Sequence, residues 1–457
     1  MGERAGRPSY RVGRCGGWVE ELYARRGPGI SREKVLRLPS QEDWREWLGS
    51  GNNDSAPGGS GISYGMLQKL PELLFVLYWK LVVVCLERQI IPRCWKDGVI
   101  FPIPKASGML AIGNCRPICL LEHAFKAISG WVCRELKWAL EEAGVLDDEQ
   151  FGFRPRRGAG LAIAGVMASI DWARRRGGQV WLLFLDCAKA FDSVPHWALE
   201  ISYRRLGFYD AIVDFLSEMD HEAQSCVLHS GRKTRQFEVG RGVRQGDVLS
   251  PLKFIVWMDA WLQMRRSMGG GIKTRVGTLN GAAYADDLTE VTTSRERMQR
   301  RIKKVGEFLT WSGMGVNADK SHVMVVGRGH GAVPPFRIQS WDAMENRVKE
   351  GSIGDVGDSA VKVLGVHIDR HLTGTKLTEV LDAGLQKFCG AILKRAKGWE
   401  QSALMVKEIL GARWAYYLPF ATVPDALLDV WDRKIRGAVK KRAGVVRSIS
   451  NSALYTS

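Results

Sequence analysis

Carboxylates at the ends of apolar runs constrain this chain more than any other feature. The run VWLLFLD at 180–186 is continuously apolar until it stops at Asp186. Such a run is typical of a strand that is buried on both faces. Asp286 and Asp287 form an adjacent pair between apolar flanks in YADDLTEV, a pattern that favours a hairpin. Burying carboxylates is costly unless they are paired or bind a cation, so the fold must supply a partner for them.

These carboxylates suit a site for divalent cations. Hard ions such as Mg²⁺ prefer oxygen ligands, and two strands that deliver carboxylates to one point can hold two metals about 3.5–4 Å apart. One metal would activate an attacking hydroxyl, and both would neutralise a transferring phosphate. Taken alone, an Asp-Asp pair is more typical of a strand end or a turn cap. The surrounding motifs therefore decide between the two interpretations.

The charge balance indicates a polyanionic partner. The 457 residues include 66 Lys and Arg against 49 Asp and Glu, a formal charge of +17. Nucleic acid is the commonest partner of such a chain, and a merely charged surface is the alternative. Nine cysteines without a C-x-x-C pair indicate reduced thiols of an intracellular protein. We expect neither a secretory signal nor a membrane span.

Hydrophobic periodicity and turn residues predict a mixed α and β chain of roughly two to four domains. Strands are expected at 99–103, 180–186 and 321–326, and hairpins within 225–240 and 282–293. Stretches rich in Gly with Ser or Pro predict loops at 49–61 and 327–335. Helices are expected at 62–89, 119–143, 161–176, 197–206, 211–219, 252–267, 298–311 and through most of 375–442.

An ordered series of motifs resembles the reverse transcriptases. VWLLFLDCAKAFDSVPH, GVRQGDVLSP and AYADDL resemble motifs A, B and C of that family. Upstream, SGISYGML, VIFPIPK, CRPICLL and EQFGFRPRRG resemble its finger motifs, and downstream VNADKSHVM and KVLGVHI resemble motifs D and E. FDSVPH, GVRQGD and QFGFR are most similar to the non-LTR retrotransposon group. Three positions depart from the family pattern: Ser60 interrupts the usual G-P-D-G-I-S, Val248 replaces a usual Pro, and Cys187 replaces a usual aliphatic residue.

The resemblance implies an α+β right-hand polymerase with a ferredoxin-like palm sheet. Such an enzyme extends a primer 3′-OH with dNTPs on an RNA template by two-metal phosphoryl transfer. The implied divisions are a basic N-terminal extension and linker at 1–55, fingers at 56–180, a palm with motifs A to E at 181–370, and a helical thumb and tail at 371–457.

The resemblance also assigns roles to individual residues. For the metal site it implies Asp186, Asp286 and Asp287, with the backbone of Cys187 as a further ligand, and Lys320 as proton donor to pyrophosphate. For the nucleotide pocket it implies Lys105, Arg116, Phe191, Gln245 and Gly246, with Phe191 as a steric gate against the ribose 2′-OH. For template and primer it implies Phe153, Arg154, Tyr284, Leu364 and Gly365.

Several of these residues also have ordinary structural interpretations. Arg116 can be an ion-pair partner, Gln245 a turn residue, Lys320 a surface lysine and Phe191 part of the core. Asp192 is expected to be structural, as a cap before Val194-Pro195.

The expected cofactors and partners follow from the resemblance. They are two Mg²⁺ or Mn²⁺ ions, an RNA template, a DNA primer, dNTPs and the element RNA in a ribonucleoprotein, with no membrane. The expected location is nuclear, with a cytoplasmic ribonucleoprotein stage; the oligomeric state is not indicated. Because 1–55 leaves no room for an endonuclease and the tail after 370 has no Cys/His cluster, we expect a polymerase piece of a longer element, or a truncated or domesticated copy.

Three other classes compete with this interpretation. A viral RNA-dependent RNA polymerase shares the palm carboxylates, but Phe191 and the Y-A-D-D context argue against it. A group II intron maturase needs a further domain, for which 443–457 is too short. A catalytically inactive relic that only binds nucleic acid is the third, and the three intact carboxylates argue against decay at the site.

Overall fold

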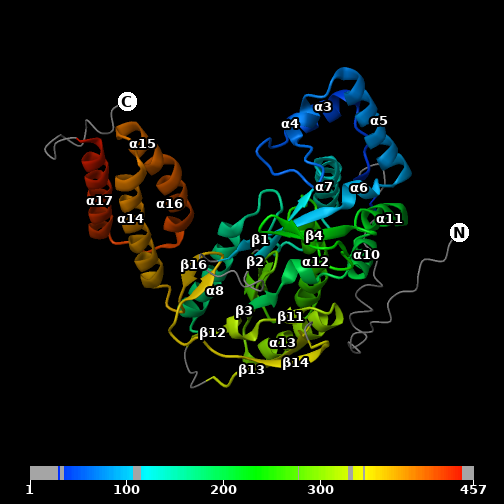
Figure 1. Ribbon diagram of the computed structural model, residues 1–457. Helices are drawn as coiled ribbons and strands as arrows, with labels where there is room; N and C mark the ends of the chain where they lie inside the picture. Colours follow the sequence, from blue (N-terminus) through cyan, green and yellow to red (C-terminus); the bar gives the residue numbers. More distant parts are fainter. Residues whose placement is uncertain are drawn as a thin grey trace.

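The chain is described by a computed structural model over residues 29–30, 35–105, 115–275, 277–327, 333–342 and 345–444. Most of the expected N-terminal extension and much of the expected loop at 327–335 lie outside these residues. Figure 1 shows three regions: helices α3 to α6 on one side, a central part with two sheets, and a C-terminal group of helices on the other side.

The N-terminal helices α3 (Gln41–Gly49), α4 (Tyr64–Gln68), α5 (Glu72–Arg88) and α6 (Arg93–Lys96) pack beside α7 (His123–Ala143). Helix α3 begins with a capping box between Ser40 and Asp43. The expectation of one helix over 62–89 is wrong, because Pro71 lies between α4 and α5 with extended backbone angles. Proline disfavours the helical conformation of the residue before it, so the chain must restart its helix.

The first sheet has the order β2-β1-β4-β5, with β6 (Phe237–Glu238) also paired to β4. Strand β1 (Gly98–Pro104) runs antiparallel to β2 (Cys115–Leu121) and parallel to β4 (Gln224–His229). The expectation of a helix from 119 is therefore wrong for 119–121, which pair with β1 before α7 begins. The expected turn at Ser230-Gly231 is confirmed: both residues have positive φ, and β5 (Arg232–Lys233) folds back on β4.

The second sheet is built around β3 (Val180–Ala188). On one side β10 (Asp287–Thr292) pairs antiparallel with β3, and β9 (Gly281–Tyr284) pairs with β10. On the other side β11 (Gly315–Val316) and β12 (His322–Val326) both pair antiparallel with β3.

Strand β3 is buried on both faces, as its apolar run predicts. Trp181, Leu183 and Leu185 belong to the core that contains α12 (Ser250–Ser267) and α13 (Arg295–Trp311). Leu182 and Phe184 belong to a second core with α8 (Ala159–Arg176) and the C-terminal helices. Smaller elements complete this part: α9 (Ala190–Ser193), α10 (His196–Arg205), α11 (Asp210–Glu218), η2 (Ala318–Lys320), and the hairpins β7 (Ile272–Thr274) with β8 (Gly277–Leu279), β13 (Phe336–Asp342) with β14 (Arg347–Ile353), and β15 (Val361–Val363) with β16 (Val366–Ile368).

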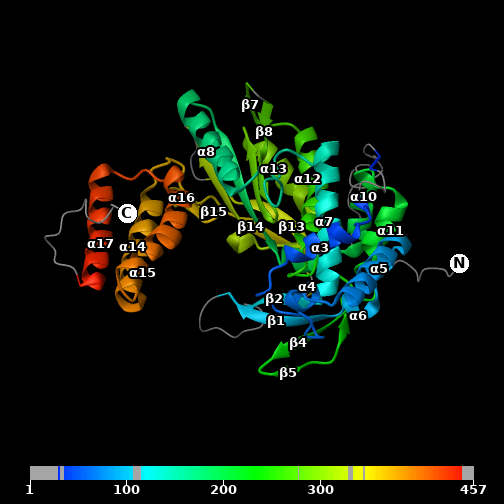
Figure 2. The ribbon, with the colours of Figure 1, turned by 90° about the horizontal axis from the view of Figure 1, so that it is seen from above.

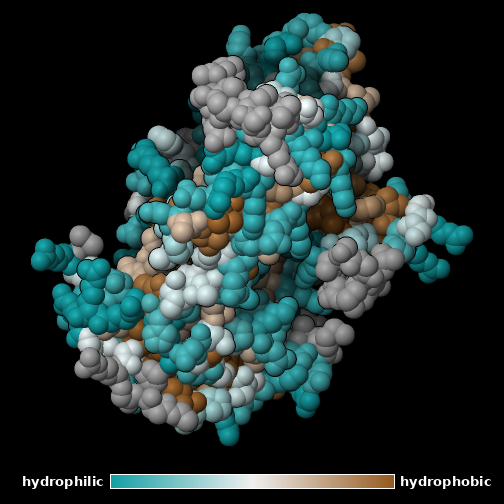
Figure 3. Space-filling view, turned by 90° about the vertical axis from the view of Figure 1, so that its left-hand side faces the viewer, coloured by the Kyte–Doolittle hydropathy of each residue, from teal (hydrophilic) through white to brown (hydrophobic). Residues whose placement is uncertain are grey.

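The C-terminal helices form a bundle that stands to one side of the sheets in both ribbon views (Figures 1 and 2). Seen from this side, the surface is mostly hydrophilic, with smaller apolar areas (Figure 3). This region confirms the expectation of a mostly helical segment at 375–442. Its elements are α14 (Thr375–Arg395), α15 (Trp399–Leu404), the π-helical turn η3 (Met405–Gly411), α16 (Ala412–Tyr417), η4 (Leu418–Phe420) and α17 (Asp425–Ala443).

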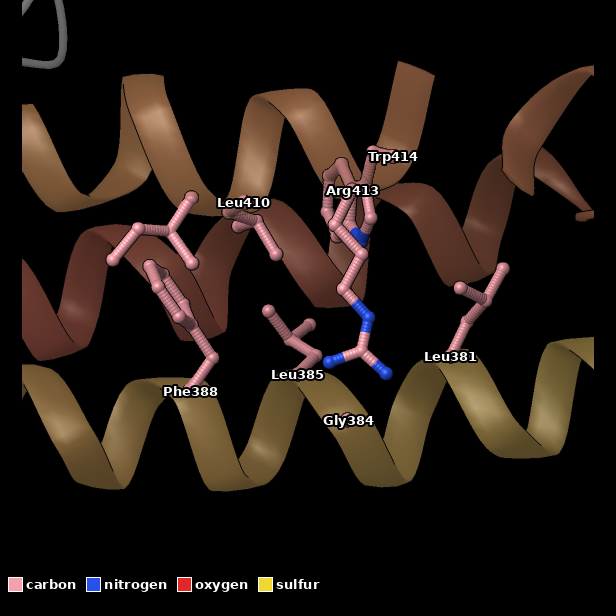
Figure 4. A pocket seen from close by; sticks show the side chains of 8 residues that line it. Leu381, Gly384, Leu385, Phe388, Leu410, Arg413 and Trp414 are labelled. Atoms are coloured by element: carbon pink, nitrogen blue, oxygen red, sulfur yellow. The ribbon is translucent and has the colours of Figure 1, made fainter. Parts of the chain in front are cut away.

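A small cavity lies inside this bundle, between α14 and the η3–α16 segment (Figure 4). Leu385 and Phe388 line it from α14, and the Arg413 side chain reaches over Gly384. Its volume of about 30 Å³ is far below the roughly 300–1,000 Å³ of ordinary ligand pockets. We therefore assign it no ligand.

Two further expectations concern the chain as a whole. Eight cysteines fall within the described residues and none of these eight is in a disulfide. None of the described helices combines the length and the apolar character that crossing a membrane requires.

Candidate active site

Two adjacent antiparallel strands bring the three aspartates of the predicted metal site together. Asp186, two residues before the end of β3, is the direct cross-strand partner of Asp287 at the start of β10. Directly opposite residues in such a pair have Cβ atoms about 4.5–5.5 Å apart and point to the same face. Asp286 lies in the two-residue turn that joins β9 to β10, next to Ala285, whose φ is 55°. The pairing of β3 with β10, together with the turn of the β9–β10 hairpin, thus places all three carboxylates at one edge of the sheet.

The three carboxylates repel one another electrostatically. Burial, together with the charges of Asp286 and Asp186, raises the pKa of Asp287 to about 6. Burial also raises the pKa of Asp286, and the charge of Asp186 adds to this effect. The pKa of the Cys187 thiol is raised by its burial and by the same three carboxylates. A cation at this edge would relieve the repulsion and hold the carboxylates ionised.

The arrangement fits an open cation site better than a closed one. Within the described ranges, no group of three or more His, Cys, Asp or Glu side chains is arranged as a ready-made metal cage. Mg²⁺ is usually held by one or two carboxylates together with substrate phosphates and waters. Two carboxylates on facing strands, with a third in the adjoining turn, match that requirement.

A cavity of about 280 Å³ opens beside the carboxylates. Asp186 and Asp287 line it together with Lys320 and Leu364, so four of the predicted site residues face one space. Asp319, His322 and Lys362 also line it and were not predicted. The 3-10 turn η2 projects Asp319 and Lys320 here, because it interrupts the pairing of β3 with β11 and β12 opposite Asp186.

The backbone of Asp186 is held by two residues that sequence reasoning missed. Asp186 N–H donates to Ser321 Oγ at 3.1 Å, and Asn317 N–H donates to Asp186 O at 2.9 Å. Ser321 is buried, and its hydroxyl donates in turn to Asn317 O at 2.9 Å. Both residues lie inside VNADKSHVM, so the motif marks the segment although it does not reveal the contacts.

Asp192 organises the neighbouring side of the site, where Phe191 and Gln245 lie. Gln245 Nε2 donates to Asp192 Oδ1 at 3.0 Å. Burial raises the pKa of Asp192, while the Gln245 hydrogen bond and the charges of Lys189 and Lys105 oppose the shift. Asp192 lies inside α9 and is not the cap that the sequence predicted. The Phe191 ring is half-buried and stacks on Phe254, with ring centroids 4.8 Å apart.

Gly246, which the resemblance assigns to the nucleotide pocket, makes a close backbone approach to β2. Its φ is 128°, and a Cβ there would collide with the carbonyl oxygen of Cys119. The preceding residue reinforces the contact, because Cys119 N–H donates to Gln245 O at 2.6 Å. Arg116 lies exposed on the same strand, opposite Ile103 of β1. Gly246 therefore joins the motif B segment to the first sheet, where Arg116 and the end of β1 before Lys105 lie.

The residues expected to contact template and primer lie in two places. The ring centroids of Phe153 and Tyr284 are 6.0 Å apart, at the start of the turn that carries Asp286. Leu364 and Gly365 form the β15–β16 turn with positive φ values. Tyr416 Oη donates to Leu364 O at 2.6 Å, so this turn is attached to α16 of the C-terminal bundle.

Arg154 is buried and is held by structural hydrogen bonds. Its guanidinium is buried and donates to both carboxylate oxygens of Glu141, at 2.6 and 2.9 Å. A third bond reaches Asp147 O at 2.6 Å. Three of its five N–H donors are used by these structural bonds and the side chain is buried, so the structure does not favour the expected template contact.

A buried ion-pair network links the carboxylate hairpin to the neighbouring helices. Arg265 Nη2 lies 2.9 Å from Glu149 Oε2, and its Nη1 lies 3.3 Å from Glu290 Oε1. Arg301 Nη1 lies 3.0 Å from Glu290 Oε2. Glu290 belongs to β10, so the network connects the hairpin to α12 and α13. Sequence reasoning gave no sign of it, since the partners are far apart along the chain.

A model of the reverse transcriptase (RNA-dependent DNA polymerase) family matches residues 103–368, more than half of the chain. The chain belongs to the reverse transcriptase family. The matched span contains Asp186, Asp286 and Asp287 and every other predicted site residue. Reverse transcriptases in general depend on divalent metal ions and act on nucleic acid.

This reverse transcriptase is similar to several retrotransposon proteins. It is 26% identical to a retrovirus-related Pol polyprotein from the type-2 retrotransposable element R2DM of Drosophila melanogaster, over 64% of this chain and 26% of that protein. It is 27% identical to a probable RNA-directed DNA polymerase from transposon X-element of the same organism, over 80% and 39%. The prediction of a non-LTR retrotransposon reverse transcriptase is confirmed. The chain spans less than two fifths of either relative.

Proposed function

We propose that this chain is an RNA-directed DNA polymerase that extends a primer 3′-OH with dNTPs. The observation that carries the proposal is the register of β3 and β10, which sets Asp186 opposite Asp287 beside the turn that holds Asp286. Membership of the reverse transcriptase family supports it, as does the X-element relative, whose name describes a probable RNA-directed DNA polymerase.

The proposal includes a division into fingers, palm and thumb. The sheet of β1 and β2 with the helices before β3 would form the fingers at 56–180. The sheet around β3 would form a ferredoxin-like palm within 181–370, and α14 to α17 would form the thumb after 371. One feature complicates the boundary: β4 lies in the palm segment but pairs with β1. The fingers would therefore include part of the segment that follows β3.

Asp186, Asp286 and Asp287, with the backbone of Cys187, would hold two Mg²⁺ or Mn²⁺ ions, whose charge supplies hydroxyl activation and neutralises the transferring phosphate. The contribution of the chain itself is positioning. Strands β3 and β10 hold two carboxylates in register, and Ser321 and Asn317 hold the backbone of Asp186. Fixed geometry of this kind is a large part of catalysis in phosphoryl transfer.

The nucleotide would lie between the carboxylates and the first sheet. Lys105 and Arg116 would contact its triphosphate, for which the forked guanidinium is well suited. The Phe191 ring would lie beneath the sugar, and Gln245 would line the pocket through its bond to Asp192. Lys320 would donate a proton to the leaving pyrophosphate, a role that its place in the cavity beside Asp186 supports.

The proposed partners are an RNA template, a DNA primer and the element RNA of a ribonucleoprotein, with a nuclear site of action. Phe153, Tyr284, Leu364 and Gly365 would contact the primer terminus and the template. The formal charge of +17 supports binding to a phosphate backbone, and the mostly hydrophilic face of the C-terminal bundle in Figure 3 suits such a partner.

The test is extension of a DNA primer annealed to an RNA template, with dNTPs and Mg²⁺ or Mn²⁺. The proposal predicts template-directed extension that a chelator abolishes and that added metal restores. Tight binding of the hybrid without any extension under these conditions would favour the inactive, nucleic-acid-binding alternative.

A further inference from the structure

The segment 149–152, from the motif EQFGFRPRRG, extends the second sheet beyond β9. Phe151 N–H donates to Ala283 O at 2.8 Å, and Ala283 N–H donates to Glu149 O at 2.8 Å. Gln150 and Ala283 form a parallel β-bridge. The segment therefore lies along the outer edge of the hairpin that carries Asp286 and Asp287.

Gln150 connects this segment to the carboxylate turn. Its side chain is buried, with 1% exposed. Gln150 Oε1 accepts from Gly152 N–H at 3.0 Å and from Ala285 N–H at 3.1 Å. Because both neighbours are N–H donors, they fix which end of the amide is the oxygen. Gln150 Nε2 is buried without a hydrogen bond among the described residues. The hydrogen bonds of this amide are therefore those accepted by Oε1.

Two features show that the turn needs an external support. Ala285 has a φ of 55°, a conformation that a residue other than glycine keeps only when its surroundings hold it. Gly152 lies directly against the turn, since a Cβ at this position would be 2.7 Å from Ala285 N and 3.1 Å from Tyr284 C. The segment and the turn are thus in backbone contact, and Gln150 Oε1 bridges them.

We propose that Gln150 is a positioning residue for Asp286. Its Oε1 atom holds Ala285 N–H and so fixes the turn that presents Asp286 beside Asp186 and Asp287. Gln150 acts only through this turn and is not itself a metal ligand or a nucleotide contact. The effect on catalysis rests on the proposed polymerase function, whereas the effect on the turn does not.

The experiment compares three variants by hydrogen exchange and by primer extension. Gln150→Met keeps the approximate volume and removes the acceptor, and Gln150→Glu keeps an acceptor at the same reach. Gln263→Met is the control, because Gln263 is a half-buried glutamine whose amide oxygen accepts from Arg205 and whose amide nitrogen donates to Val145 O, outside the turn. Exchange is followed in peptides that cover 149–153 and 281–288.

Gln150→Met is expected to exchange faster at Gly152 and Ala285 and to lose about 10–100-fold in kcat, the usual scale for residues that orient ligands. The KM for dNTP should change little, since the nucleotide contacts are intact. Gln150→Glu should restore both the protection and most of kcat. Gln263→Met should leave exchange at the turn unchanged and kcat close to wild type, whatever its effect on stability.

Protection of the turn that is unchanged in Gln150→Met would overturn the proposal, and so would an equal loss of kcat in Gln263→Met. Should Gln150→Met fail to fold, Gly152→Ala tests the same contact from the other side. It should also accelerate exchange at Ala285, and unchanged exchange there would overturn the proposal. A wild-type protein without polymerase activity would refute the proposed function, while the exchange data would still decide whether Gln150 holds the turn.

Discussion

Replacing Phe191 by valine tests whether this ring selects the sugar of the incoming nucleotide. The ring stacks on Phe254 with an interplanar angle of 9°. Its backbone is held as well, since Val243 N–H donates to Phe191 O at 2.8 Å. One face of the ring is therefore occupied by Phe254, and the side chain has little freedom to move away from a ribose.

The size of the expected effect follows from the cost of burying a hydroxyl. A 2′-OH pressed against the ring loses water without gaining a partner, which costs roughly 1–3 kcal/mol. Steric overlap adds to this cost, because close packing leaves little room to relax. Since each 1.4 kcal/mol is about tenfold, discrimination against ribonucleotides should be about a hundredfold or more. Phe191→Val loses the stacked pair but keeps part of the buried side chain. Its stability should therefore fall by less than the roughly 3–5 kcal/mol of a Phe→Ala change.

The assay is single-nucleotide addition on one primer–template, with dNTP and rNTP compared for each protein. Phe191→Val should accept ribonucleotides at least tenfold better relative to dNTP, by the hydroxyl cost above, and should keep much of its dNTP activity. Phe254→Leu is the companion variant, because it removes the stacking partner but keeps the Phe191 side chain itself; it should relax the preference for dNTP less than Phe191→Val does. Equal use of both sugars by the wild type, or an unchanged preference in Phe191→Val, would show that Phe191 is only core packing.

Three further predictions concern binding and stability. Affinity for an RNA–DNA hybrid should fall steeply with salt, with a log–log slope of several units; binding that ignores salt would contradict the phosphate-backbone interpretation. Glu290→Ala removes the carboxylate that buried Arg265 and Arg301 share, so that Arg301 loses its ion pair while Arg265 keeps only Glu149; denaturant unfolding should show a loss of about 3–5 kcal/mol, and a near-neutral result would refute the network. Gly246→Ala should cost at least about 1–3 kcal/mol through its positive φ, and wild-type stability in thermal unfolding would argue against the contact with Cys119.

The core of the fold could be predicted where burial and chemistry point the same way. The apolar run that ends at Asp186 predicts a strand buried on both faces, and the structure places it between two cores. The helix prediction was wrong at 119–121, because the periodicity of a short apolar run next to a helix does not distinguish a strand from a helix. The helix prediction was also wrong at Pro71, where a continuous helical pattern corresponds to two separate helices, α4 and α5.

The site could be predicted only as far as its motifs. The motifs identify the segments that carry Asp186 and Asp286, but they do not reveal which side chains hold those segments. Ala285 and its partner Gln150 are 135 positions apart, as are Asp186 and Ser321. Arg154 was assigned to the template for the same reason, since its ion pair with Glu141 depends on how the chain folds back on α7.

The central claim is that Asp186, Asp286 and Asp287 form the catalytic centre, and paired Asp→Asn variants test it most directly. Asp286→Asn removes one charge from the carboxylate turn, whereas Asp319→Asn removes one from the wall of the adjoining cavity. Primer extension on an RNA template should fall by at least about a hundredfold in Asp286→Asn, the scale of losing one preorganised electrostatic group. It should stay near wild type in Asp319→Asn, and both variants should still bind the hybrid. Near-normal extension by Asp286→Asn, with binding intact, would contradict the account.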